Sequence, residues 1–112
     1  MDLQSKSVDN VQILTLSGRF DALTAPLVQE WLEQTLSPEH CRIVIDLKAV
    51  SFVDSTALAT LVSGMKRARQ LEGDLCLCGL QPPVRMVFEL TRLDQAFEIF
   101  LNEEDAIRAL TP

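Results

Sequence analysis

The feature that most constrains the fold is an almost uninterrupted apolar run at residues 41–47, C-R-I-V-I-D-L. Its β-branched residues favour a strand, and its lack of polar alternation is typical of a strand that is covered on both faces. Strands of this kind occur in parallel or mixed sheets with further layers packed over them. The sequence therefore predicts an α/β domain in which this run forms a middle strand.

Shorter patterns on either side predict the other elements. The expected elements are strands at 3–8, 11–16, 41–47, 75–78 and 97–100, and helices at 24–36, 57–70, 84–90 and 103–110. Asp9 and Asn10 suit a hairpin turn between the first two strands. Gly18 is expected to end the second strand, and residues 48–53 are expected to form a connector between the middle strand and the next helix.

The order of these elements predicts one α/β domain over residues 1–112. Its sheet should be mixed and mostly parallel, with about five strands, an antiparallel N-terminal strand and about four helices packed on it. The first helix is expected to bury one stripe of residues, namely Leu27, Val28, Trp31, Leu32 and Thr35.

Composition limits the classes of partner. The chain has 112 residues, a formal net charge of −6 and a pI of about 4.6. An acidic protein repels nucleic-acid phosphates and anionic membrane surfaces, so we expect no nucleic acid and no membrane as partner. No apolar run approaches the roughly 20 residues that span a bilayer, and residues 1–10 contain no signal-peptide core. We therefore expect a cytoplasmic protein.

A small polar triplet, Asp54-Ser55-Thr56, precedes the amphipathic helix at 57–70. Such side chains cap helices, because their oxygens accept free backbone N–H groups. A hydroxyl at this place is also suited to phosphorylation, since the helix dipole and the N–H groups favour an anion. Carboxyl ends of parallel strands gather at one edge of a sheet, so we expect the loops at 18–21 and 50–56 to meet there and to bring Asp21 near the triplet. The residues alone leave capping and phosphorylation both open.

The motifs of catalysis are missing from the chain. His40 precedes the middle strand and Ser55 follows it, so roughly 20 Å of strand separates them. The nucleophile-elbow and phosphate-binding glycine motifs are absent, as is the carboxylate cluster of a response-regulator site. Cys76 and Cys78 do not have the spacing of a redox or zinc motif, and we interpret them as buried apolar residues. We expect no enzyme, no cofactor and no metal site.

Three segments together resemble a known family. Residues 43–58, I-V-I-D-L-K-A-V-S-F-V-D-S-T-A-L, resemble the signature of STAS domains, the sulfate-transporter and anti-sigma-factor-antagonist modules. Residues 16–27, L-S-G-R-F-D-A-L-T-A-P-L, resemble the second strand and first helix of that family. Residues 90–100, L-T-R-L-D-Q-A-F-E-I-F, resemble its C-terminal segment. The resemblance covers nearly the whole chain and implies a stand-alone STAS domain over residues 1–112.

The resemblance implies an anti-sigma factor antagonist that works by partner switching. In that mechanism the unphosphorylated protein binds an anti-sigma factor that is also a serine kinase, phosphorylation separates the two, and a metal-dependent serine phosphatase resets the cycle. Carried onto this sequence, the phosphorylated residue is Ser55, and Asp21, Asp54, Ser55, Thr56 and Ala57 form the partner-binding end. Ala57 stands where many members have glycine, and alanine favours the helix over the freedom of the loop.

Two alternatives remain at the level of sequence. A STAS subunit of a lipid or anion transporter, or of a stress-signalling complex, would carry an unmodified Ser55 and would copurify with its assembly. A small hydrolase would depend on both Ser55 and His40.

Overall fold

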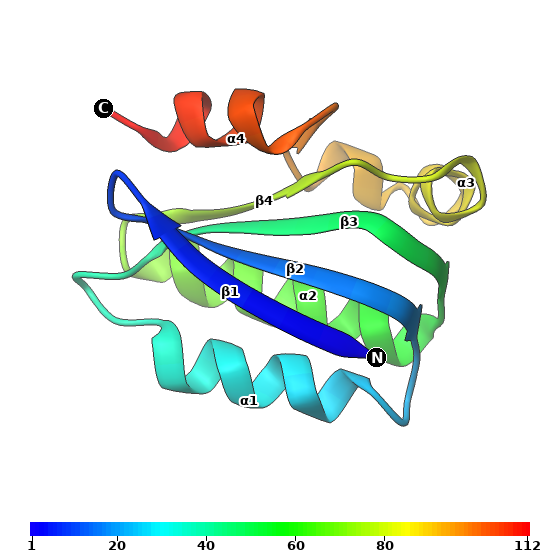
Figure 1. Ribbon diagram of the computed structural model, residues 1–112. Helices are drawn as coiled ribbons and strands as arrows, with labels where there is room; N and C mark the ends of the chain where they lie inside the picture. The colour runs from blue at the N-terminus through cyan, green and yellow to red at the C-terminus, as the bar shows by residue number, and fades with distance from the viewer.

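A five-stranded sheet lies between two layers of helices in the computed structural model, which describes residues 1–112 (Figure 1). The strands are β1 (Asp2–Val8), β2 (Val11–Phe20), β3 (Arg42–Val53), β4 (Asp74–Cys78) and β5 (Ile99–Phe100). The helices are α1 (Ala25–Thr35), α2 (Ser55–Gln70), α3 (Pro82–Leu90) and α4 (Glu103–Leu110), and a short 3₁₀ turn spans Leu93–Gln95. The predicted α/β class is confirmed.

The strands lie across the sheet in the order of the chain, from β1 to β5. β1 is antiparallel to β2, and every later strand is parallel to its neighbour. The hairpin between β1 and β2 turns at Asp9 and Asn10, whose φ values are 51° and 66°. A two-residue type I′ turn needs positive φ at both positions, which explains why this pair suits the hairpin.

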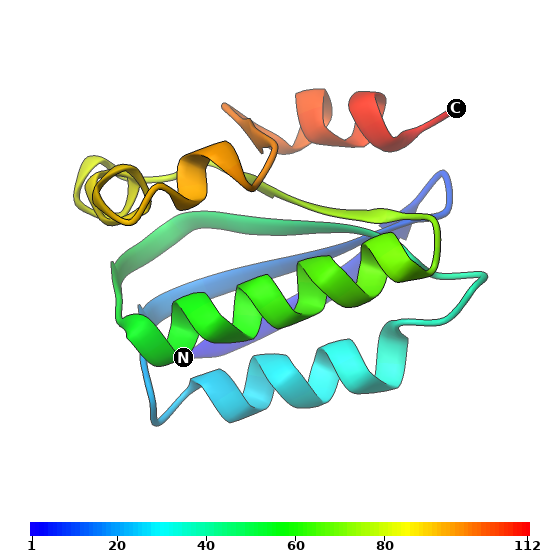
Figure 2. The same ribbon diagram turned by 180° about the vertical axis from the view of Figure 1, so that it is seen from behind.

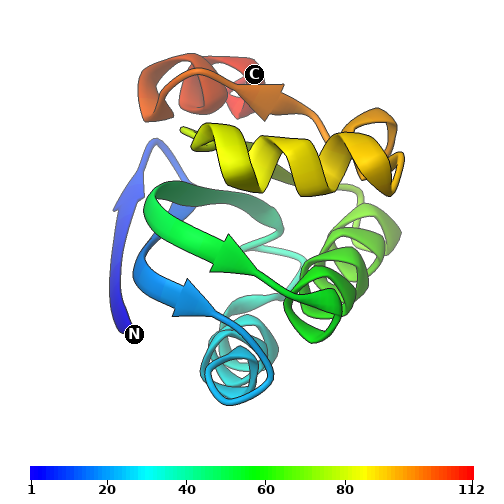
Figure 3. The same ribbon diagram turned by 90° about the vertical axis from the view of Figure 1, so that its right-hand side faces the viewer.

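Helices α1 and α2 cover one face of the sheet, and α3 and α4 cover the other (Figures 1 and 3). Seen from behind, α1 and α2 lie side by side along the sheet (Figure 2). In β3, Ile43, Ile45 and Leu47 belong to the main core of 22 buried residues, whereas Val44 joins a second cluster of five that includes Ala106 of α4. Both faces of β3 are therefore buried, as the apolar run predicts.

Two strands extend further than the sequence indicates. β2 continues through Gly18 to Phe20, and residues 48–53 continue β3 instead of forming a connector. The β2–β3 ladder contains two register shifts, one on each side of Gly18, and Gly18 has a φ of 102° that an L side chain rarely adopts. These irregularities disrupt the alternation of buried and exposed residues after Leu47, so the sequence pattern there does not resemble a strand.

Several helix and strand details also differ from the expectations. α1 buries Ala25, Val28 and Leu32, whereas Leu27 is exposed, because the helix turns a narrower face to the sheet than the predicted stripe. α2 begins at Ser55 instead of residue 57, with Asp54 as its N-cap. The last strand is shorter than expected, since Phe97 leaves the ladder and packs edge-to-face on Phe88, with ring centroids 5.8 Å apart.

Arg69 fixes the carboxyl end of α2. Its Nε lies 2.9 Å from Oδ1 of Asp74 at the start of β4, and its Nη2 donates to the carbonyl of Ala96 at 2.9 Å. The side chain therefore connects α2 with the start of β4 and with the segment that precedes β5. A cation in the last turn also complements the helix dipole.

A pair of acids joins α4 to the sheet. Asp46 of β3 is 2% exposed, accepts the backbone N–H of Lys48 at 3.0 Å and hydrogen bonds to Glu103 at the start of α4. Glu103 in turn forms an ion pair with Lys6 of β1 at 3.0 Å. Burial, followed by the hydrogen bond to Glu103, raises the pKa of Asp46, whereas the same hydrogen bond lowers the pKa of Glu103. The Lys48 ammonium, 3.6 Å from Oδ2 of Asp46, acts in the opposite direction on the pKa of Asp46.

Protonation of Asp46 makes stability depend on pH, because the pKa of this carboxyl group is raised in the folded protein. The folded state binds this proton more tightly than the unfolded chain, so the contribution of Asp46 to stability is present at low pH and is lost as the pH rises through the raised pKa. Glu103 acts in the opposite sense, because its contribution is lost as the pH falls through its lowered pKa. Asp46→Asn cannot ionise but can still donate to Glu103 and accept from Lys48. We expect it to be more stable than the wild type at high pH.

Urea denaturation at a series of pH values from about 4 to about 8 measures the difference, which should grow as the pH rises. Asp46→Ala is the control, since it removes both hydrogen bonds and should lower the free energy of unfolding by about 1–3 kcal/mol. Parallel pH profiles for Asp46→Asn and the wild type would show that the pKa of Asp46 is not raised in the folded protein.

Candidate functional site

The carboxyl ends of β2 and β3 form one edge of the sheet, and the loops that leave them lie against each other. The backbone N–H of Asp54 donates to the carbonyl of Phe20 at 3.3 Å, which extends the β2–β3 pairing beyond the last strand residues. From this edge, β2 leads into α1 and β3 leads into α2, both on the same face of the sheet (Figure 1). Asp21 and the triplet Asp54-Ser55-Thr56 are therefore brought to the same edge, as the parallel topology predicts.

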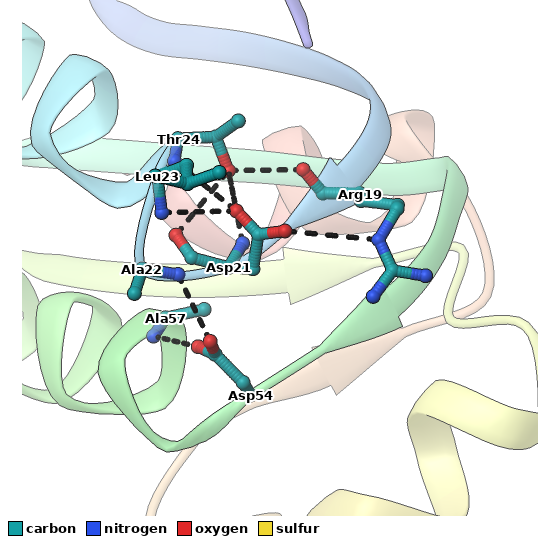
Figure 4. Close-up of polar contacts among 7 residues, drawn as sticks. All are labelled: Arg19, Asp21, Ala22, Leu23, Thr24, Asp54 and Ala57. Carbon is teal, nitrogen blue, oxygen red and sulfur yellow. Dashed lines mark hydrogen bonds and ion pairs between the residues drawn. The ribbon is translucent and has the colours of Figure 1, made fainter.

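Asp54 connects the two loops (Figure 4). Its Oδ1 accepts the backbone N–H of Ala57 at 2.9 Å, which caps α2. Its Oδ2 accepts the backbone N–H of Ala22 at 2.9 Å, which holds the loop between β2 and α1. The N-cap function that the sequence left open thus belongs to Asp54, and both oxygens of this carboxylate are occupied.

Asp21 forms hydrogen bonds within the loop between β2 and α1. Its Oδ1 accepts the backbone N–H groups of Leu23 and Thr24 at 3.0 and 3.2 Å, and Oδ2 lies 3.7 Å from Nε of Arg19. Desolvation acts to raise the pKa of Asp21, but the two N–H groups, the Thr24 hydroxyl and Arg19 together outweigh it and lower the pKa. Asp21 is therefore a charged group that organises a turn.

The remaining predicted residues occupy the first turn of α2. Ser55 and Thr56 are exposed, and Ser55 takes no part in the cap. Ala57 is completely buried, so its side chain packs in the core beneath the first turn of α2 and exposes no surface to a partner. A serine hydroxyl at the first residue of a helix lies next to unsatisfied N–H groups and the positive end of the helix dipole.

Three residues of this surface are not indicated by the sequence patterns. Leu23 is 88% exposed in the loop between β2 and α1, and Phe52 near the end of β3 is 38% exposed. The guanidinium of Arg19 lies 4.0 Å from the centroid of the Phe52 ring, a cation–π contact. The only signal in the sequence is that Leu23 belongs to neither of the periodic patterns beside it.

A groove of about 300 Å³ opens between α1 and α2 next to Thr56. Hydroxyl groups and Arg67 line it, and the Thr60 hydroxyl donates to the carbonyl of Thr56 at 3.1 Å. No group of three or more histidine, cysteine or acidic residues in the structure is arranged to bind a metal ion. None of the helices combines the length and the apolarity needed to cross a membrane.

The cysteines and the histidine lie away from this edge. Cys41, Cys76 and Cys78 are buried free thiols, as the sequence predicts for Cys76 and Cys78, and burial as the main cause raises the pKa of Cys76 and Cys78 to about 12. Such thiols are poor nucleophiles. His40 forms an isolated β-bridge with Ser37 in the connection that precedes β3, whereas Ser55 follows the opposite end of that strand.

Comparison with known proteins agrees with this architecture. The sequence model of the STAS domain matches residues 2–106. The anti-sigma-B factor antagonist of Listeria monocytogenes is 36% identical over 99 residues, which are 88% of this chain and 86% of that protein. This chain therefore belongs to the STAS domain family, and the resemblance found in the sequence is confirmed.

Solved structures share the fold over nearly the full length. A crystal structure from Thermotoga maritima has a TM-score of 0.92 at 25% identity and covers 98% of this chain and 95% of its own. The anti-sigma factor antagonist SpoIIAA of Bacillus has the same fold in its unphosphorylated form, with a TM-score of 0.75 at 20% identity over 96% of each chain. Its phosphorylated form gives 0.76 at 19% identity, over 96% of this chain and 98% of that one.

The double contact of Asp54 predicts the effect of removing it. Asp54→Ala is expected to lower the free energy of unfolding by about 1–2 kcal/mol and to speed amide exchange at Ala22, because the cap and the loop lose the same acceptor. Denaturant unfolding and hydrogen exchange measure the two effects.

Asn102→Ala is the matched control, since Asn102 caps α4 with one bond to the N–H of Asp105 at 2.9 Å. It should destabilise the protein by about 1 kcal/mol and leave exchange at Ala22 unchanged. If Asp54→Ala also left exchange at Ala22 unchanged, the loop would not depend on Asp54.

Proposed function

We propose that this protein is an anti-sigma factor antagonist whose binding to an anti-sigma factor kinase is switched by phosphorylation of Ser55. The observation that carries the proposal is an exposed serine at the first residue of α2 that Asp54 leaves free by capping the helix itself. The relative from Listeria, named as an anti-sigma-B factor antagonist, supports the same function for this chain.

In the proposed cycle the unphosphorylated protein binds an anti-sigma factor that is also a serine kinase. The kinase phosphorylates Ser55 and the complex dissociates, and a metal-dependent serine phosphatase restores the first state. The protein acts by binding and not by catalysis, needs no cofactor, and works in the cytoplasm. The proposed partner-binding end comprises Asp21, Asp54, Ser55 and Thr56, with Ala57 contributing from below.

Electrostatics explains how one phosphoryl group can change the partner. It adds about −1.5 to −2 charges at neutral pH, at a helix N-terminus that tolerates an anion, so the domain stays folded. Asp54 and Asp21 already place two carboxylates at this edge, and the protein carries a net charge of −6. A partner surface suited to the neutral serine then meets a concentrated negative charge. A loss of about 3 kcal/mol in binding free energy would weaken the complex roughly a hundredfold.

The test uses Ser55→Asp and Ser55→Ala with the purified kinase that phosphorylates the wild type in the presence of ATP. We expect Ser55→Asp to bind this kinase at least roughly tenfold more weakly, because it places a permanent charge in the interface. Ser55→Ala should bind like the wild type and take up no phosphate. Calorimetry gives the affinities and mass spectrometry locates the phosphate.

Ser7→Asp adds the same charge on β1, where Ser7 is exposed, and should leave the affinity unchanged. Equal affinity of Ser55→Asp and the wild type, or a phosphate on any other residue, would contradict the proposed function.

A further inference from the structure

The loop between β2 and α1 presents Leu23 to solvent. Of the six exposed large apolar side chains, Leu23 has the highest exposed fraction, 88%. A leucine in a loop normally folds back onto the nearest apolar surface, because burial of its side chain stabilises the protein. Here the Leu23 side chain stays in solvent. The exposed leucine is therefore available to contact a bound partner.

Hydrogen bonds hold the backbone on both sides of Leu23. The N–H of Ala22 donates to Asp54, and the N–H groups of Leu23 and Thr24 both donate to Oδ1 of Asp21 (Figure 4). The Thr24 hydroxyl also donates to the carbonyl of Arg19 at 2.9 Å. Three successive N–H groups are thus satisfied by two carboxylates. A loop fixed in this way loses little conformational freedom when a partner covers it.

The position of the loop determines which partner covers it. Asp54 directly precedes Ser55, and the same carboxylate holds Ala22 at 2.9 Å. An enzyme that transfers a phosphoryl group to Ser55 must bring its reacting atoms within contact distance of the hydroxyl and surround it. The body of such an enzyme therefore extends over the adjoining loop. Arg19, stacked on Phe52 beside this loop, already faces Oδ2 of Asp21 at 3.7 Å, but its side chain is 63% exposed, so its remaining N–H groups can pair with a carboxylate of the partner.

We infer that Leu23 is the apolar anchor by which the anti-sigma factor kinase holds this protein, and that Asp21 and Asp54 are positioning residues that present it. The inference rests on the proposed function and adds the chemistry of the interface. The kinase offers an apolar socket for Leu23 and an acidic group for Arg19. Backbone N–H groups donate to both oxygens of Asp54 and to Oδ1 of Asp21, and Oδ2 of Asp21 faces Arg19, so we assign both carboxylates to holding the loop.

The anchor also explains why a charge on Ser55 separates the complex. An apolar socket excludes water from the surface around it, and a dianion that borders such a surface loses part of its hydration. The bound state therefore becomes less favourable for the phosphorylated protein, although Leu23 itself is unchanged.

The test measures the affinity of Leu23→Ala for the purified kinase that phosphorylates Ser55. We expect a loss of at least roughly tenfold, with unchanged amide exchange in the loop, because the substitution removes only an exposed side chain. The matched control is Leu101→Ala, since Leu101 is 81% exposed at the segment before α4. It should bind like the wild type. Equal affinities of Leu23→Ala and Leu101→Ala would overturn the inference.

A double-mutant cycle tests the positioning role of Asp21. Asp21→Ala should weaken binding in the wild-type background and have no further effect in the Leu23→Ala background, because it acts through the leucine. A general loss of structure would weaken binding in both backgrounds, and so would a direct contact of Asp21 with the kinase. Additive effects would therefore contradict the positioning role.

The outcomes for Ser55 and Leu23 separate the two proposals. If Ser55→Asp weakens binding and Leu23→Ala does not, the switch stands and the anchor is wrong. If Leu23→Ala weakens binding and Ser55→Asp does not, the anchor is supported and the phosphorylation switch is wrong. A wild-type protein that binds no such kinase overturns both.

Discussion

The carboxylate of Asp54 joins the start of α2 to the loop between β2 and α1, and the arrangement of this edge depends on that contact. Each of its oxygens satisfies a backbone N–H group that would otherwise be left without a partner in the chain. The contact places two loops that are far apart in sequence against each other. It also leaves the next residue, Ser55, outside the cap. Asp54 thus caps the helix, and the adjacent Ser55 keeps its hydroxyl group available.

The fold follows from local patterns wherever those patterns are regular. The apolar run at 41–47 indicates a doubly covered strand, and the structure buries Val44 on one face and Ile45 on the other. The pattern fails after Leu47, because two register shifts in the β2–β3 ladder change which residues face the core. A bulge is a property of two strands together, so neither strand shows it alone.

The candidate site likewise contains some residues that the sequence indicates and others that it does not. The triplet Asp54-Ser55-Thr56 is evident from the sequence, because three small polar residues directly precede a periodic helix. The family pattern adds Asp21. The prominence of Leu23 could not be predicted, since it depends on hydrogen bonds from its loop to two aspartates, one of them more than thirty residues away. The burial of Ala57 likewise depends on how α2 meets the sheet, and not on its neighbours in the chain.

Helix α2 is fixed at both ends, by Asp54 at its start and by Arg69 at its finish. Contacts at both ends favour a single position of the helix, so we expect a modification at its start to leave that position unchanged. Under the phosphorylation proposed for Ser55, the two forms of the protein should then have nearly the same shape and differ in what their surface displays. Discrimination between the two forms becomes a property of the proteins that read that surface. Related domains could therefore acquire new partners through changes in a few exposed side chains, while the scaffold beneath them stays as it is.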